Sequence, residues 1–270
     1  MKILITGASS GIGYEISKEL INEKHKLVLH YNKNKKKLQP LLTKNTHAVS
    51  QDLSSSLGAQ QLYEQTIAHF GFPDVLINNA GIEISSSVNT DADFWNSSWN
   101  KILNINLGAP AYLCKCFINT KRNKNINSRF RIINISSRAA FRGETEDFIA
   151  YACSKGGLVS LTKTISRSFG KKENVLAFTI APGFVHTDMN KDIIQQPENR
   201  RIYNKTWFKT FKVAFLVTLF CLIMGYPIAY LLSTLPLKYS NLLMICVLLP
   251  FWTSLLVRTA AWMIILQQKG

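Results

Sequence analysis

The sequence predicts an α/β fold with a doubly wound parallel sheet, followed by a helical membrane segment. Short apolar runs alternate with helical stretches through the first 190 residues, which is typical of parallel strands covered by helices on both faces. From Lys212 onward the chain carries few charges and is long enough to cross a membrane twice. We therefore expect a soluble domain at 1–190, a basic linker at 191–211 and two transmembrane helices at 212–270.

Polar residues follow the predicted strands. The apolar runs cover residues 2–5, 26–30, 75–77, 130–135 and 175–180. The ends of four of these runs carry Thr6, Asn78, Ser136 with Ser137, and Pro182 with Gly183. Because open α/β sheets bind ligands at the carboxyl ends of their strands, these residues mark the expected site.

Composition argues against a nucleic-acid partner, a metal site and export. The net charge is +16, but the basic residues gather in a solvated loop at 33–37 and beside the first membrane span at 200–212. Because that arrangement suits an exposed loop and a membrane flank, we expect no nucleic-acid partner. The five cysteines lack paired zinc-type spacing, so we expect reduced thiols and no metal. The N-terminus begins with a strand pattern rather than a signal peptide, so we expect the domain to stay in the cytosol.

A glycine-rich loop, Thr6-Gly7-Ala8-Ser9-Ser10-Gly11-Ile12-Gly13, joins the first predicted strand to the first predicted helix. Its glycines let the backbone turn tightly and approach a pyrophosphate, whose charge would meet free N–H groups at the helix N-terminus. Taken alone, such a loop can be a simple turn. Its position between a strand and a helix favours nucleotide binding.

Tyr151 and Lys155 lie four residues apart in a predicted helix, so their side chains share one face. They follow Ser137, the glycine-rich loop and the run Asn78-Asn79-Ala80-Gly81. In this order, and with Pro182-Gly183, the motifs resemble the short-chain dehydrogenase/reductase family over residues 1–190. The resemblance implies a Rossmann-type sheet and hydride transfer between a nicotinamide cofactor and a small carbonyl or alcohol substrate.

The resemblance also implies four catalytic residues. Tyr151 is the expected general acid/base, because Lys155 and an oxidised nicotinamide would stabilise its phenolate. Ser137 is expected to hydrogen-bond the reacting oxygen, and Lys155 is also expected to contact the nicotinamide ribose. Asn106 is expected to anchor a proton-relay water; the alternative is an ordinary asparagine inside a helix.

NADP is the expected cofactor, with NAD as the weaker alternative. The second strand ends near Asn32 and Lys33 without the carboxylate that would bind an NAD ribose, and Lys33 would attract a 2′-phosphate. Asp52 is expected at the adenine edge, and Asn79 and Gly81 on the adenine-ribose side. The expected cofactor residues are Gly7, Ser9, Ser10, Gly11, Ile12, Gly13, Asn32, Lys33, Asp52, Leu53, Asn79, Gly81, Tyr151, Lys155, Pro182, Gly183 and Thr187.

Two departures from the family pattern affect the prediction. The spacing from Ser137 to Tyr151 is one residue longer than usual, so residues 138–150 are expected to be shaped for this protein's own substrates. After Met189 the sequence lacks the family's substrate-covering helices and last strand. We therefore expect a sheet without its last strand, an exposed apolar edge and impaired turnover.

Residues 213–232 and 242–266 predict an α-helical transmembrane hairpin. The basic flank before the first span places its entry on the cytoplasmic side, so we expect a multi-pass protein of the cell inner membrane, in contact with lipid and with a cytoplasmic N-terminal domain. Residues 225–230 and 249–259 resemble permease subunits of ABC importers, most closely the polyamine type. That resemblance implies ABC transporter subunits as partners.

Three interpretations follow from the two resemblances. The chain is a membrane-tethered NADP-dependent reductase, a permease component for polyamine-type transmembrane transport, or a non-functional fusion of two gene fragments. Tyr151 with Lys155 beside the glycine-rich loop supports the first, and the permease-like motifs support the second. A truncation on each side of one junction supports the third. The sequence leaves the substrate and the oligomeric state open.

Overall fold

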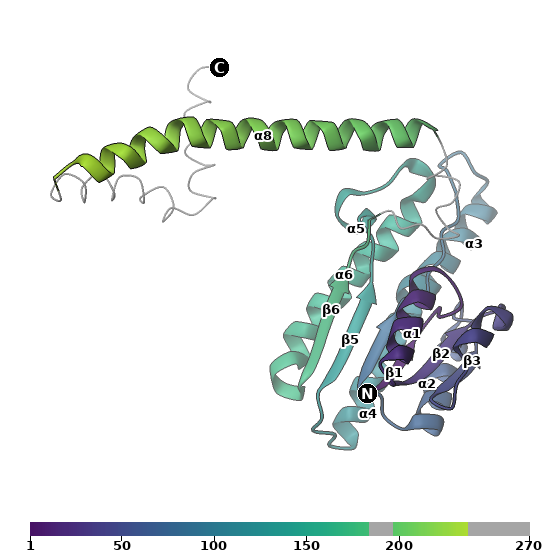
Figure 1. Cartoon of the computed structure of the whole chain (residues 1–270). Coiled ribbons are helices and arrows are strands. Elements are labelled where there is room, and N and C mark those ends of the chain that lie inside the picture. Colours follow the sequence, from purple (N-terminus) through teal and green to yellow (C-terminus); the bar gives the residue numbers. More distant parts are fainter. Residues whose placement is uncertain (184–196, 237–270) are drawn as a thin grey trace. The chain divides into compact units, whose positions relative to one another are not determined.

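The computed structural model describes residues 1–183 and 197–236 (Figure 1). The chain divides into two compact units, Met1–Gln195 and Gln196–Gly270. In the described residues, the first unit holds a sheet with its surrounding helices, and the second holds one long helix.

Six parallel strands form the sheet, in the order β3-β2-β1-β4-β5-β6. The order reverses between β1 and β4, where doubly wound folds bind their ligands. This architecture confirms the predicted α/β fold. The strands are β1 (Lys2–Ile5), β2 (Lys26–Tyr31), β3 (Thr46–Ser50), β4 (Val75–Asn78), β5 (Phe130–Ile135) and β6 (Val175–Ile180).

The strand β3 was not among the predicted apolar runs. Its sequence, Thr-His-Ala-Val-Ser, contains few apolar residues, and only Val49 is fully buried. Pairing with β2 and packing against the core through Val49 fix it as a strand. Tertiary context therefore outweighed a weak local pattern.

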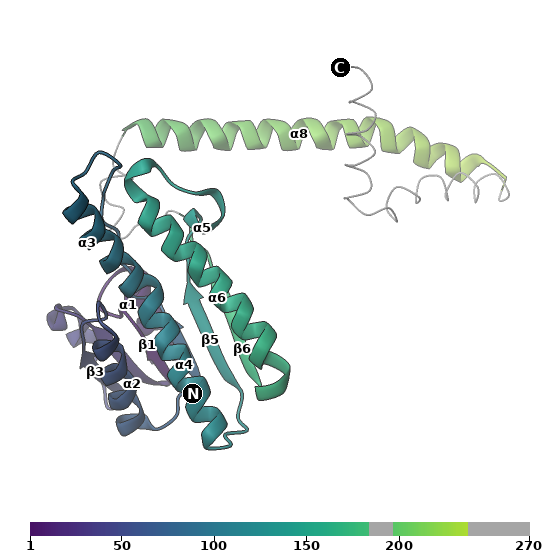
Figure 2. The ribbon, with the colours of Figure 1, turned by 180° about the vertical axis from the view of Figure 1, so that it is seen from behind.

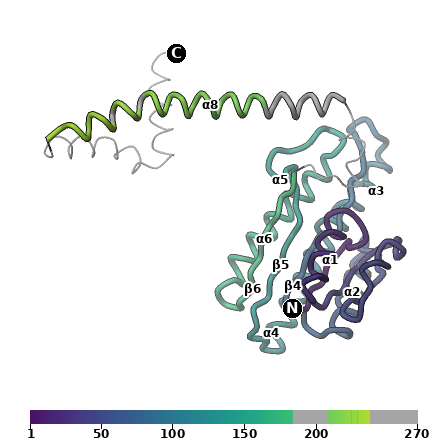
Figure 3. The backbone as a smooth tube through the Cα atoms, viewed as in Figure 1, coloured from purple at the N-terminus to yellow at the C-terminus, as the bar shows by residue number. Residues whose placement is uncertain are grey.

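Helices and short turns connect successive strands, and the path of the chain is drawn as a tube in Figure 3. The α-helices are α1 (Gly11–Asn22), α2 (Ser56–Phe70), α3 (Ala92–Leu103), α4 (Ala109–Asn123), α5 (Ala139–Arg142) and α6 (Ile149–Glu173). The 3₁₀ turns are η1 (Lys35–Leu41) and η3 (Glu146–Phe148), and η2 (Asn104–Gly108) is a π-helical turn between α3 and α4.

The two faces of the sheet carry separate apolar cores. On one face Leu4 and Ile132 pack with α2, α4 and α6, which lie over the sheet in Figure 2. On the other face Ile3 and Ile5 pack with α1 and η1. Alternate residues of β1 thus enter opposite cores, as the two-residue period of a strand requires.

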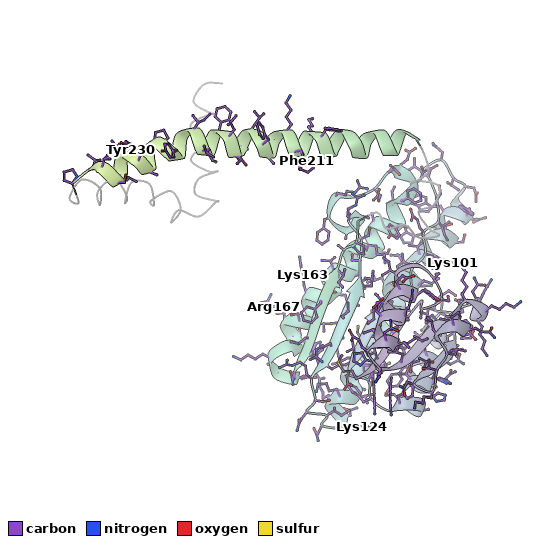
Figure 4. The ribbon with its side chains drawn as sticks, in the orientation of Figure 1. Lys101, Lys124, Lys163, Arg167, Phe211 and Tyr230 are labelled. Atoms are coloured by element: carbon purple, nitrogen blue, oxygen red, sulfur yellow. The ribbon has the colours of Figure 1, made fainter. Side chains whose placement is uncertain are left out.

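On α6, Leu158 and Ile165 face the core, whereas Lys163 and Arg167 project outward (Figure 4). This helix of 25 residues is therefore amphipathic, with one face in the core and one in solvent. The helix spans the sheet and carries Tyr151 and Lys155 in its first two turns.

The strand β6 forms one edge of the described sheet. Phe178 is 50% exposed and Ile180 is 48% exposed, although both belong to an apolar strand. Phe178 pairs with Ile133 and Ile180 pairs with Ile135 on β5. These residues lie on the sheet face that α1 and η1 cover near β1 and β2. Within residues 1–183 no helix covers this part of that face, which matches the expected apolar edge.

The second unit contains α8 (Pro197–Thr234), a helix of 38 residues. The most apolar 18-residue window of its segment Phe208–Thr234 has a mean hydropathy of 2.1, and none of that window is buried. Phe211 and Tyr230 lie on it with exposed rings (Figure 4). By length and composition, α8 could cross a membrane.

The predicted first span, 213–232, lies within α8. The helix begins at Pro197, so it also runs through most of the predicted linker at 191–211. The predicted second span, 242–266, lies outside the described residues. The described residues therefore contain one candidate span, and the hairpin stays a prediction.

Candidate active site

The glycine loop, residues 6–13, turns between β1 and α1. Gly7 and Gly11 have φ values of 67° and 52°, which L-residues rarely adopt. The helix cap Ser10 is extended, and its side chain makes no capping bond. The first-turn N–H groups of α1 thus lack a side-chain acceptor, an arrangement that suits an anionic ligand.

Asn79 fastens this loop to the end of β4. Its side-chain amide donates to the carbonyls of Thr6 and Gly7 at 3.0 and 3.1 Å. In return, the Thr6 hydroxyl accepts the N–H groups of Asn79 and Ala80, both at 2.9 Å. The side chain expected on the adenine-ribose side is therefore engaged by the protein itself.

Gly13, in the first turn of α1, packs against the contact between Gly7 and the Asn79 side chain. A Cβ atom there would lie 2.3 Å from the Gly7 carbonyl oxygen and 2.4 Å from the Asn79 amide nitrogen. The Gly7 oxygen belongs to the backbone, and the Asn79 amide is held by its two hydrogen bonds, so glycine is required for packing. The sequence suggested approach to a pyrophosphate at this position; the structure shows that a side chain here would first collide with the loop.

His30, which the sequence analysis did not single out as functional, holds the loop from β2. Its Nδ1 accepts the Gly7 N–H at 3.1 Å, so Nε2 carries the proton and donates to the Gln51 carbonyl at 3.0 Å. Burial lowers the pKa of His30 to about 4, and the Gln51 bond and the Asp52 charge oppose this only in part. A polar residue inside the apolar run at 26–30 was the available signal.

The residues expected to choose between cofactors follow β2 and β3. Asn32 and Lys33 are exposed. Asp52 is also exposed and accepts the Ser54 N–H at 2.9 Å, and this bond is the main reason that its pKa is lowered. Leu53 is buried in the core, so only its backbone can face a ligand.

Lys155 is 4% exposed, and its ammonium donates to the Ile135 carbonyl at 2.9 Å. Burial lowers its pKa to about 8. A Cβ atom on Gly81 would lie 3.3 Å from the lysine nitrogen, so the glycine keeps the space beside the ammonium clear. An ammonium group has three N–H donors. One bonds to the Ile135 carbonyl, so the other two are available to the hydroxyl groups of a ribose.

Tyr151 lies next to Lys155 and Ser137, as the sequence predicted. The lysine nitrogen is 5.7 Å from the tyrosine ring centre. Burial raises the pKa of Tyr151; a hydrogen bond with the Ser137 hydroxyl lowers it, and the charges of Glu83 and Glu144 raise it further. The protein alone therefore favours the neutral phenol, which is the form able to donate a proton.

Asn106 lies in the π-helical turn η2 and is 1% exposed. Its side chain accepts the Ile82 N–H at 2.8 Å and donates to the Ile82 carbonyl at 2.9 Å. A further bond at 3.1 Å reaches Ser154. The amide thus joins the loop after β4 to α6, and π-helical turns are frequent at functional sites.

The remaining predicted residues are less constrained. Ser9, Gly11 and Ile12 are partly exposed in the glycine loop. Pro182 and Gly183 follow β6 after Ala181, and Thr187 lies outside the described residues. Among the residues that are described, no group of three His, Cys, Asp or Glu side chains could hold a metal ion.

Comparison with known proteins identifies the family of the chain. The family model described as short chain dehydrogenase matches residues 1–198. The chain is 30% identical to a 3-oxoacyl-[acyl-carrier-protein] reductase of Chlamydia muridarum, covering 73% of this chain and 78% of that relative. It is 26% identical to glucose 1-dehydrogenase 2 of Bacillus subtilis (strain 168), covering 77% and 81%.

Solved structures agree with this assignment. A 4-hydroxyisoleucine dehydrogenase in complex with NADH superposes with a TM-score of 0.67 at 28% identity, covering 74% of this chain and 80% of that one. The six-stranded parallel sheet matches the fold of the family. The chain belongs to the short-chain dehydrogenase family of nicotinamide-dependent oxidoreductases.

Proposed function

We propose that this chain binds NADP and catalyses hydride transfer to or from a small carbonyl or alcohol substrate, with Tyr151 as general acid/base. The observation that carries this proposal is the grouping of Tyr151, Ser137 and a buried Lys155 at the strand ends that also hold the glycine loop. The chain of contacts from Gly7 through Ala80 and Gly81 to Lys155 joins the two parts.

The cofactor, when bound, supplies or accepts the hydride. In carbonyl reduction, Tyr151 donates its phenolic proton to the substrate oxygen, and Ser137 hydrogen-bonds that oxygen. Lys155 stabilises the resulting phenolate, because its positive charge lies on the same face of α6. Its other protons hold the nicotinamide ribose. Asn106 keeps the loop at Ile82 in place and anchors the proton-relay water.

We assign NADP rather than NAD from the end of β2. Lys33 is exposed there, and residues 30–35 contain no carboxylate that would repel a 2′-phosphate. Asn32→Asp should reverse the ratio of NADPH to NADH affinity, because the new carboxylate accepts ribose hydroxyls and repels the phosphate. An unchanged ratio in fluorescence titrations would contradict this assignment.

The cofactor test uses the cap of α1. Ser10→Asp supplies a good helix cap while placing a carboxylate at the proposed pyrophosphate position, so NADPH affinity should fall about tenfold or more without loss of stability. Ser55→Asp is the matched control, because Ser55 caps α2 through the Gly58 N–H at 3.3 Å. Equal NADPH affinity in both variants, measured by fluorescence, would exclude the glycine loop as the phosphate site.

We further propose that α8 anchors the chain in the cell inner membrane, with the N-terminal domain in the cytoplasm. The exposed apolar surface of Phe208–Thr234 supports contact with lipid. The full chain should stay in the membrane pellet after alkaline carbonate washing. Recovery of the full chain in the supernatant would contradict the anchor.

The permease interpretation remains a separate prediction. Of its two motif segments, the first lies in α8 and the second lies outside the described residues. An exposed apolar helix is equally compatible with a membrane anchor and with a permease subunit. The two interpretations therefore differ only in the partner proteins that they require. Copurification of an ABC ATPase subunit with the detergent-solubilised chain would favour transport, and its absence would favour the anchor.

A further inference from the structure

Glu83 is a charged residue of the candidate site that neither the motifs nor the mechanism uses. It follows Ile82, whose N–H and carbonyl are both held by the Asn106 side chain. Two residues earlier, Gly81 faces the Lys155 ammonium. The backbone at Glu83 is therefore held beside the catalytic group rather than in a loosely placed loop.

A second segment, residues 144–147, is bonded to the loop that carries Glu83. The Ser86 N–H donates to the Asp147 carbonyl at 2.9 Å, which ties the loop after β4 to η3. Glu144 lies just before η3 and acts electrostatically on both Glu83 and Tyr151. The two loops thus bring two carboxylates to the same end of α6 as the phenol.

The two carboxylates differ in their partners. Glu144 forms an ion pair with Arg142 at 2.7 Å. Glu83 is partly buried, and within residues 1–183 and 197–236 it forms no ion pair and no hydrogen bond through its carboxylate. Burial is the main reason that its pKa is raised, and the charge of Glu144 raises it further. A carboxylate in such surroundings is costly unless a cation compensates it.

We propose that Glu83 determines substrate specificity by binding a protonated amine that lies next to the reacting carbonyl or alcohol. This inference rests on the proposed function and names its substrate class: small amino ketones or amino alcohols. An ammonium would compensate the charge of Glu83 and form a charge-assisted hydrogen bond. It would also offset the carboxylate charges that act on Tyr151 when the phenolate forms.

Three ketones of equal carbon number test the proposal with the full-length protein and NADPH. Aminoacetone carries an ammonium, hydroxyacetone is neutral, and pyruvate is anionic. We expect kcat/KM to decrease in that order. Glu83→Gln should lower the ratio of aminoacetone to hydroxyacetone kcat/KM about tenfold or more, because charge-assisted bonds are the stronger kind. Glu83→Asp should retain part of the preference, and the exposed Glu19→Gln should retain all of it.

Each other outcome has a defined meaning. An unchanged ratio in Glu83→Gln overturns the inference, and so does a native preference for hydroxyacetone or pyruvate. Equal losses for aminoacetone and hydroxyacetone would show that Glu83 supports the site as a whole rather than the amine, and would also overturn the inference. NADPH fluorescence separates the two proposals: bound NADPH without preference for aminoacetone, in turnover or in ternary-complex fluorescence, overturns only this inference. A chain that does not bind NADPH overturns both.

Discussion

The two sides of the site use their polar residues differently. On the glycine-loop side, the side chains of Thr6, His30 and Asn79 bond to backbone groups of the loop and of the residues after β4, and Gly13 leaves room for the Asn79 amide. On the tyrosine side, which comprises Ser137, Tyr151, Lys155 and Glu83, the charged groups are buried or partly buried and have few partners. The lysine ammonium has the Ile135 carbonyl as an acceptor among the described residues.

This difference indicates a division of labour between fold and chemistry. Polar groups satisfied within the protein stabilise a loop shape, and their loss should cost folding free energy. Groups left with spare bonding capacity in a buried site are available to ligands, and their loss should cost activity. The predictions below test that division, beginning with the largest effect.

Removing the Tyr151 hydroxyl should separate activity from stability most clearly. Tyr151→Phe is expected to lower kcat about 10²–10⁴-fold, the range for general acid–base groups, with little change in Tm. NADPH oxidation and thermal denaturation measure the two effects. Tyr112→Phe is the matched control, because its hydroxyl bonds to Gln60 on α2, and it should keep full activity. A Tyr151 variant that loses stability instead of turnover would break the comparison.

Adding a single methyl group on the glycine-loop side should lower stability. Gly13→Ala places a Cβ within 2.4 Å of two neighbours, and such overpacking costs about 1–3 kcal/mol of unfolding free energy. Urea denaturation of the apo protein measures this cost. At Gly170 the nearest atom would be 3.6 Å away, so Gly170→Ala should not destabilise. Equal stability of the two variants would show that the loop relaxes around the added atom.

Acid should weaken the glycine-loop side through His30. Its folded pKa of about 4 lies below the ordinary value of 6.5, so the unfolded chain binds the proton first as pH falls. Stability is therefore lost between about pH 6.5 and 4, with a slope of up to about 1.4 kcal/mol per pH unit for one proton. His30→Gln should flatten the slope in this window.

Alkali should act on the tyrosine side through Lys155. Its folded pKa of about 8 lies below the ordinary value of 10.5, so the unfolded chain holds the extra proton between these values. The cost of burying the ammonium is thus present below about pH 8 and is relieved as pH rises toward 10.5. Lys155→Met should remove this rise in apo stability, whereas the exposed Lys163→Met should keep it. Parallel profiles for the native protein and Lys155→Met would contradict the buried charge.

Much of the fold could be predicted because its signals are local. Apolar runs marked five of the six strands, and the helix spacing after the glycine loop marked α1. The order of short motifs indicated the catalytic group, and the structure brings Ser137, Tyr151 and Lys155 together. The strand β3 was missed because its pairing with β2, rather than its own composition, makes it a strand.

The sequence by itself determined the alternation of strands and helices, the glycine loop and the spacing of Tyr151 and Lys155, because these patterns repeat over a few residues. Only the tertiary structure decided that Asn79 holds the loop 73 residues before it, that His30 is buried and neutral, and that the charge of Glu83 acts on Tyr151. Those properties depend on contacts between distant segments and on the burial that the contacts create, which no local pattern encodes.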